Sequence, residues 1–231
     1  MKRFWSHAAP LEEAGLYIVQ LDKRVVKMPS GAPLAVPYRA LAEAIAQEWE
    51  EAAKDFSPND LPLTQLACTA RERIAPHRAN IIAQLAAYGL NDLLCYRAEG
   101  PELLVSRQHA EWDPWLRWFN AAHGIGLITT SGLMPVNQLP WTKTKLEALL
   151  TNRTNDELAA LGVLVPVLGS FVLGLAAAEG ALDPEAACTT AALDELWQAE
   201  QWGKDEAEAA KHAAHMAEVV DAVRFIRLTC A

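Results

Sequence analysis

Two histidines and one cysteine are the residues of this 231-residue chain whose types and settings could support catalysis. His212 and His215 are three residues apart in a segment with helical spacing, so their imidazoles could face one metal ion. They lie outside any HExxH frame, and Glu218 is placed to pair with His215 instead. Cys95 could act as a nucleophile, but the apolar run 93–96 around it is typical of a small core residue. A hydrolase or metal-dependent enzyme using these residues is one hypothesis.

The rest of the sequence offers little support for an enzyme. The glycines at 124–126 and 169–170 do not form GxGxxG, a P-loop or GxSxG. The four cysteines lack the short, repeated spacing of a zinc cluster or a disulfide framework. We therefore expect no cofactor, no bound metal and no catalytic residue.

The segment 193–203, LDELWQAEQWG, places acids among aromatic and apolar side chains. On a helix, Glu195 falls among alanines and Trp202, and Glu200 falls among leucines and Trp197. A buried, unpaired carboxylate is costly, so each must pair, accept a proton or face a partner. Tryptophan rimmed by polar groups is typical of protein–protein hot spots. The segment therefore predicts a surface for a protein partner.

Internal pairing is the alternative for the two glutamates. In that interpretation both pair with arginines from the N-terminal half of the chain, such as Arg71, Arg73 or Arg78. The residues alone leave the two interpretations open. Residues 112, 115 and 118 are tryptophans and could form a second binding stripe, but core packing is the simpler expectation.

Charge and hydropathy bound the classes of partner. The net charge is −9, and no Lys/Arg cluster exceeds a dipeptide, so we expect no nucleic acid. Residues 179–221 carry eleven acids against two lysines, which could steer a positively charged partner or form a solvated helical face. Residues 158–178 carry no charge, but glycines and a proline interrupt them, so we expect a helix pair or one kinked helix without membrane insertion. The opening residues lack an apolar signal region, so a cytoplasmic location is expected.

The hydrophobic pattern predicts an α+β fold. Residues 16–21 and 25–28 read as a hairpin, followed by an extended piece at 33–37. Helices are expected at 39–53, 64–74, 76–88, 102–112, 113–124, 142–150, 183–203 and from 205 onward. The short run 127–130 could be a strand that joins the N-terminal sheet. We expect a small β-containing domain with one helix at 1–60 and a larger helical domain at 61–231.

Ordered segments along nearly the whole chain resemble the assembly chaperone of the α subunit of F-type ATP synthase. They are KRFW at 2–5, LDKRVVKMPSGAPLAVP at 21–37, PLT at 62–64, YG at 88–89, DLLCYR at 92–97, Gln108, WDP at 112–114, GS at 169–170, LGLA at 173–176 and DELWQAEQWG at 194–203. Two segments depart from the family pattern. The hairpin turn reads DKR at 22–24 where the family tends to have Asp-Gly-Arg, and residues 161–166 are more apolar than expected.

The resemblance implies a chaperone without enzymatic activity, and a bacterial, cytoplasmic member of the family. It would bind the free α subunit, mask the interface that the subunit later uses, and release it during assembly of the hexamer. The implied fold has a small N-terminal α+β domain and a larger helical domain. The partner-binding residues expected here are Glu195, Trp197, Gln198, Glu200 and Trp202, supported by Asp92 and Arg97.

Overall fold

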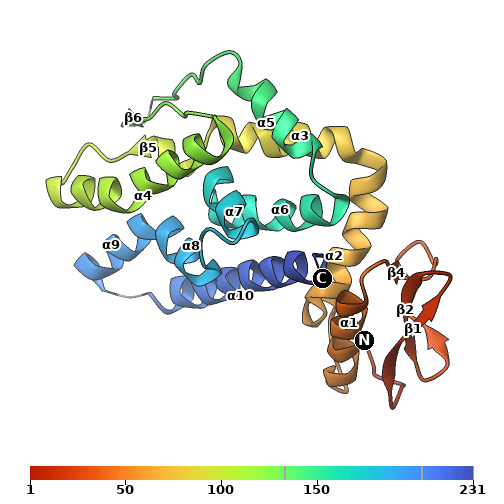
Figure 1. The fold of residues 1–231 in the computed structure, drawn as a ribbon. Helices are drawn as coiled ribbons and strands as arrows, with labels where there is room; N and C mark the ends of the chain where they lie inside the picture. The colour runs from red at the N-terminus through yellow and green to blue at the C-terminus, as the bar shows by residue number, and fades with distance from the viewer. Residues whose placement is uncertain (133, 204, 231) are drawn as a thin grey trace. The chain divides into compact units, whose positions relative to one another are not determined.

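The computed structural model describes residues 1–132, 134–203 and 205–230, and it has the expected α+β class (Figure 1). The chain forms two compact units. The first contains residues 1–78, 155–160 and 221–231, and the second contains residues 79–154 and 161–220. The division into domains at residue 60 stays a prediction.

The first unit contains a small antiparallel sheet. Its strands are β1 (Ala8–Glu13), β2 (Leu16–Leu21), β3 (Arg24–Val25) and β4 (Ala35–Val36), and β2 pairs with the other three. The sequence prediction omitted β1, because its alanines, proline and glutamates are residues that strands disfavour. Helix α1 (Arg39–Glu51) packs against β1, β2 and β4.

Helices follow the sheet, and one of them is longer than the sequence predicted. A short helical turn (Pro58–Asp60) precedes α2 (Pro62–Thr69), a π-helical turn (Ala70–Ile74) and α3 (Ala75–Leu90). The backbone of α3 is non-helical at His77 (φ −119°, ψ 19°), so a kink lies within two residues of the break expected at residue 75. Helix α4 (Glu102–His123) runs through Pro114, so the helix start expected at 113 is wrong. The Asp113 carboxylate does not cap a new helix because it accepts a hydrogen bond from Arg97 at 2.7 Å.

The strand expected near 127–130 does not join the N-terminal sheet. Strand β6 (Thr130–Ser131) instead pairs in parallel with β5 (Tyr96–Arg97), which follows a helical turn at Leu93–Cys95. The pairing is local to the second unit, because both strands lie within residues 79–154. The expectation was wrong because a short β-rich run specifies a strand but not its neighbour.

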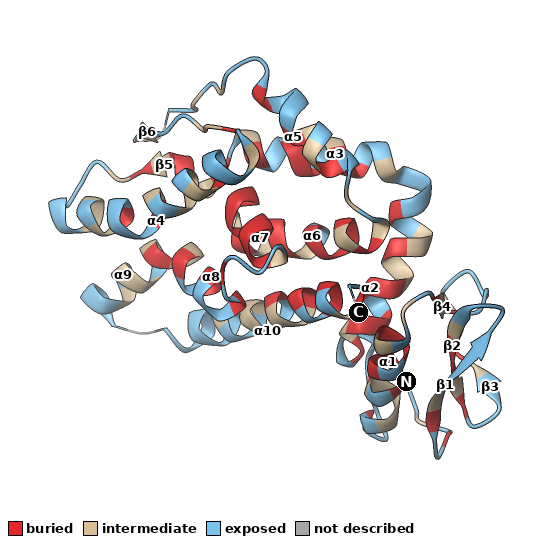
Figure 2. Cartoon of the chain, viewed as in Figure 1, coloured by how far each residue is buried: buried red, intermediate tan, exposed pale blue. Residues whose placement is uncertain are grey.

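The remaining helices are α5 (Thr142–Thr151), α6 (Asn155–Leu168), α7 (Phe171–Ala178), α8 (Pro184–Ala191), α9 (Leu193–Trp202) and α10 (Glu206–Leu228). The uncharged stretch forms a helix pair, α6 and α7, which separate at Gly169 (φ +62°). Helix α7 is buried from Phe171 to Ala177 (Figure 2), and a Cβ on Gly174 would lie 3.0 Å from Val165 Cγ2. Small residues therefore allow close helix packing here. Within the described residues, no helix is long and apolar enough to cross a membrane.

The helix expected at 183–203 is two helices. Helix α8 begins where Asp183 caps it, accepting a hydrogen bond from the Glu185 backbone N–H at 3.0 Å. It ends at Ala192 (φ −84°, ψ 18°), where α9 begins. Alanine is a strong helix former, so helix propensity could not predict a break at this residue. The break gives α9 a direction of its own.

Candidate partner-binding surface

Helix α9 is held to α4 by contacts along its length. The Trp112 indole N–H donates to the Thr190 carbonyl just before α9, at 2.8 Å. Gln108 Nε2 donates to Asp194 Oδ1 at 2.8 Å, and Arg107 Nη1 donates to both Glu200 carboxylate oxygens at 2.9 and 2.8 Å. These contacts pair the end of α9 with the beginning of α4, as Figure 1 shows. The helix is thus fixed on one side and free on the other.

Most of the residues predicted for partner binding on α9 are in contact with solvent. Glu195, Gln198 and Glu200 are exposed, and Trp197 is half-buried. Trp202 is 81% exposed at the end of the helix. Leu103, at the paired beginning of α4, is 73% exposed. Two large apolar side chains are therefore exposed to solvent, Trp202 at the end of α9 and Leu103 at the beginning of α4.

Internal pairing applies to one of the two glutamates and uses an arginine outside the three candidates. Glu200 pairs with Arg107, and both side chains remain in contact with solvent, at 50% and 38% exposure. Arg71 pairs with Asp156 at 3.0 Å instead. Glu195 forms no hydrogen bond or ion pair with any described residue. The acids of α9 are therefore not sealed inside the protein.

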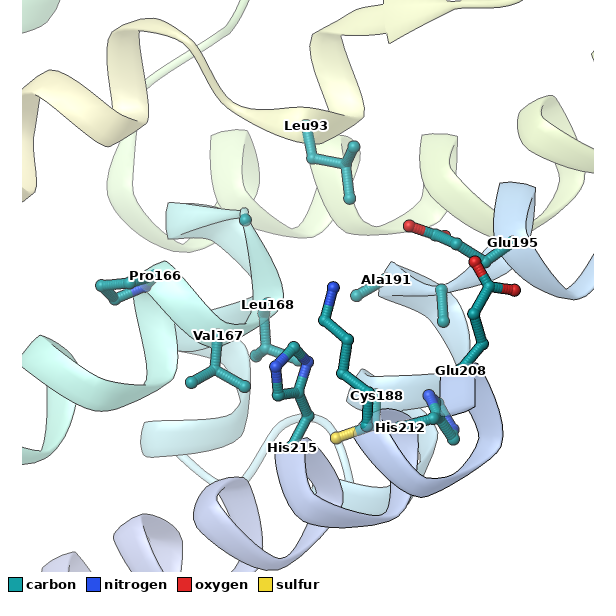
Figure 3. A pocket seen from close by; sticks show the side chains of 13 residues that line it. Leu93, Pro166, Val167, Leu168, Cys188, Ala191, Glu195, Glu208, His212 and His215 are labelled. Carbon is teal, nitrogen blue, oxygen red and sulfur yellow. The ribbon is translucent and has the colours of Figure 1, made fainter. Parts of the chain in front are cut away.

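A pocket of about 360 Å³ lies beside α9 in the second unit (Figure 3). Its apolar wall consists of Leu93, Val167, Leu168, Cys188 and Ala191, and its polar rim consists of Glu195, Glu208, Lys211, His212 and His215. Figure 3 shows Glu195 and Glu208 at one end of the pocket and His215 away from them. On the α10 side of the rim, the sequence had singled out His212 and His215, though as a possible metal pair. It missed Glu208 and Lys211, although all four residues recur at helical spacing (208, 211, 212, 215).

Asp92 lies inside the protein and does not reach the surface. It is fully buried and accepts hydrogen bonds from the Leu94 N–H at 2.9 Å, the Val172 N–H at 2.9 Å and the Ser170 hydroxyl at 2.8 Å. Burial raises the pKa of Asp92 to about 6, although these hydrogen bonds act in the opposite direction. Asp92 therefore joins the turn after α3 to the start of α7 and makes no direct contact with a partner here.

Arg97 is also an internal residue. It is 5% exposed, and its guanidinium donates to Asp113 Oδ1 at 2.7 Å and to the carbonyls of Leu94 and Gln108, each at 2.9 Å. It also lies 5.2 Å from the centre of the Trp112 ring. Its support for a partner surface is therefore structural, since it fixes α4, which in turn holds α9.

The residues of the enzyme hypothesis are not arranged for that chemistry. Cys95 is fully buried, and burial together with the nearby Asp92 charge raises the pKa of its thiol to about 12. A thiol with that pKa stays protonated at neutral pH and is a poor nucleophile. His212 and His215 line the pocket, but across the described ranges no three His, Cys, Asp or Glu side chains are grouped to hold a metal ion.

Comparisons with known proteins agree with the fold and the motifs. The family model for the ATP12 chaperone protein matches residues 2–120. The crystal structure of Atp12 from Paracoccus denitrificans is 40% identical, covers 99% of this chain and 98% of that one, and aligns with a TM-score of 0.93. The Atu1473 protein of Agrobacterium tumefaciens is 33% identical, with 98% and 85% coverage and a TM-score of 0.93. The mitochondrial atp12 protein of Schizosaccharomyces pombe is 26% identical over 217 residues, which are 89% of this chain and 75% of that protein.

These matches extend over essentially the whole chain in the solved structures, at identities of 33% and 40%. They include both the N-terminal sheet and the helices that build the α9 surface. The resemblance seen in the sequence motifs is therefore confirmed by independent comparisons of sequence and of structure. The chain belongs to the ATP12 family of ATP synthase assembly chaperones.

Proposed function

We propose that this chaperone binds the free α subunit of F-type ATP synthase, masks the surface that the subunit uses for hexamer contacts, and releases it during assembly. Membership of the family supports a role in ATP synthase assembly. The proposal that the client is the α subunit comes from the resemblance seen in the sequence. A free ring subunit exposes apolar surface that would aggregate, and a chaperone that covers it prevents this loss. A cytoplasmic location stays a prediction from the sequence.

The observation that carries the proposal is the exposure of Trp202 on an otherwise anchored helix. An indole that is 81% exposed gains more from a partner than from its own fold. Hot spots of protein interfaces are enriched in tryptophan, and rigid presentation lowers the entropy lost on binding. Release then requires that the hexamer contacts bind the subunit more tightly than the chaperone does, so that the assembling subunits displace it.

Purified or co-expressed α subunit provides the test. We expect the wild-type chaperone to keep the α subunit soluble, and Trp202→Ala to weaken binding by at least tenfold with unchanged thermal stability. The matched control is Trp141→Ala, which removes a tryptophan that is 42% exposed at the start of α5. If the α subunit aggregates equally with and without the wild-type chaperone, the proposal is wrong. If both tryptophan variants bind like wild type, the α9 surface is not the contact.

A further inference from the structure

We propose that the pocket beside α9 receives a long basic side chain, arginine or lysine, from the α subunit. This inference rests on the proposed function and adds the chemistry by which the client is recognised. Its starting point is the combination of a pocket of about 360 Å³, an apolar wall and a rim with two carboxylates at the same end (Figure 3).

The apolar wall fits the stem of such a side chain. Leu168 and Cys188 line the pocket and are almost completely buried, at 3% and 4% exposure, so packing holds both in place. Arginine and lysine carry three or four methylene groups, which bury well against apolar surface while the charged head stays at a polar edge.

The carboxylates at one end of the rim fit the charged head. Glu195 and Glu208 are both exposed, and neither forms a hydrogen bond or ion pair with a residue that the structure describes. Glu195 comes from α9 and Glu208 from the first turn of α10, so the pair is available to a cation that enters between the two helices. A guanidinium could donate to both carboxylates with its planar, forked set of N–H groups.

The rim also carries positive charge, so the charge of the ligand has to be decided between a cation and an anion. Lys211 lines the same pocket, as do His212 and His215. These three residues would favour an anion if they dominated the pocket. The formal charges favour a cation, because two carboxylates line the pocket against one lysine, and residues 179–221 as a whole carry eleven acids and two lysines.

The experiment measures the affinity of the α subunit for charge variants of the full-length chaperone at fixed ionic strength. We expect Glu195→Gln combined with Glu208→Gln to weaken binding about tenfold, since both partners of the incoming cation are lost. Lys211→Gln removes a repelling charge and should tighten binding about threefold. The matched control, Glu12→Gln combined with Glu13→Gln, removes two exposed acids from strand β1 and should change binding less than twofold.

Two results would overturn the inference while leaving the chaperone function intact. The first is binding of the α subunit with the same affinity by all the variants. The second is the reverse order, in which loss of Lys211 weakens binding and loss of the glutamates tightens it, because the pocket would then take an anionic group. Failure of the wild-type protein to bind the α subunit would instead refute the proposed function itself, so the two failures are distinguishable. Unchanged circular dichroism and thermal unfolding of each variant show that the fold is retained.

Discussion

Charged residues in two regions of the second unit differ in burial and in their hydrogen bonds. Asp92 and Arg97 are buried, and each makes hydrogen bonds to a distant part of the chain, Asp92 to Ser170 and Val172 and Arg97 to Gln108 and Asp113. Glu195 and Glu208, on α9 and α10, are exposed and lack a partner within the described part of the chain. Both regions belong to segments that carry the family resemblance or adjoin them.

The difference separates two reasons for a charge to be present. A buried charge with a full set of partners contributes to structure, because removing either side leaves an unsatisfied group in a low dielectric. An exposed charge without a partner adds little to stability and is free to meet another molecule. Residues of the first kind should therefore affect unfolding, and residues of the second kind should affect binding of the client.

The largest expected effect on stability comes from Arg97. We expect Arg97→Ala to lower the free energy of unfolding by about 3–5 kcal/mol, because it leaves the Leu94 and Gln108 carbonyls without their donor and removes one of the two partners of the Asp113 carboxylate. Arg97→Lys keeps the charge but loses the forked geometry, so it should rescue only part of the loss. Urea unfolding of the three proteins gives the comparison. A loss below about 1 kcal/mol for Arg97→Ala would show that the buried network is not structural.

The pH dependence of stability should identify the Asp92 carboxyl. Burial raises its pKa from an ordinary value of 3.8 to about 6, so the folded protein keeps this proton at a higher pH than the unfolded chain does. Binding of this proton by Asp92 therefore contributes its full stabilisation below about pH 4, and the stabilisation is lost as the pH rises through about 6. Wild type should gain stability relative to Asp92→Asn as the pH falls through this window. Parallel unfolding curves of the two proteins from pH 4 to 7 would contradict the assignment.

Local patterns in the sequence predicted most elements of the fold but not their connections. The hairpin at β2 and β3, α1, and the α6–α7 pair follow from periodicity and turn residues, which act over a few positions. Strand β1 was missed because its composition opposes its conformation, which pairing with β2 and packing against α1 stabilise. The continuity of α4 was missed because the Asp-Pro pair resembles a helix start, whereas the Asp113 carboxylate is engaged by Arg97.

The candidate site shows the same limit. The mixture of acids and tryptophans in α9 was visible in the sequence, because it needs only the helical period. The partner of Glu200 was not visible, since Arg107 lies 93 residues away and only the packing of α4 on α9 brings the two together. The pocket was also not visible, because its wall comes from segments as distant as Leu93 and Cys188. Sequence patterns thus predicted which helix matters, and tertiary contacts decide which of its side chains are free.

An intermediate loss of stability is expected from substitution of Ser170, which both binds the buried Asp92 and caps a helix. Its hydroxyl donates to Asp92 at 2.8 Å and accepts from the Leu173 N–H at 3.0 Å, so it caps α7 and satisfies the buried acid. Ser170→Ala should lower the free energy of unfolding by about 2 kcal/mol, the combined loss of a cap and a buried hydrogen bond. Ser170→Thr keeps the hydroxyl and should lose less. Equal losses for the two variants, measured by thermal unfolding, would mean that packing rather than hydrogen bonding fixes this position.

The smallest effect on stability is expected from the surface pair of Arg107 and Glu200, which gives the sharpest contrast with Arg97. Arg107→Ala should lower the free energy of unfolding by less than about 1 kcal/mol, because both side chains are solvated and their attraction is screened. The same substitution frees the Glu200 carboxylate, so it should strengthen binding of a basic client surface while leaving the fold intact. Urea unfolding at low and high salt measures the first effect, and α-subunit affinity measures the second. If Arg107→Ala lowers the free energy of unfolding as much as Arg97→Ala does, the pair is structural and does not belong to the binding surface.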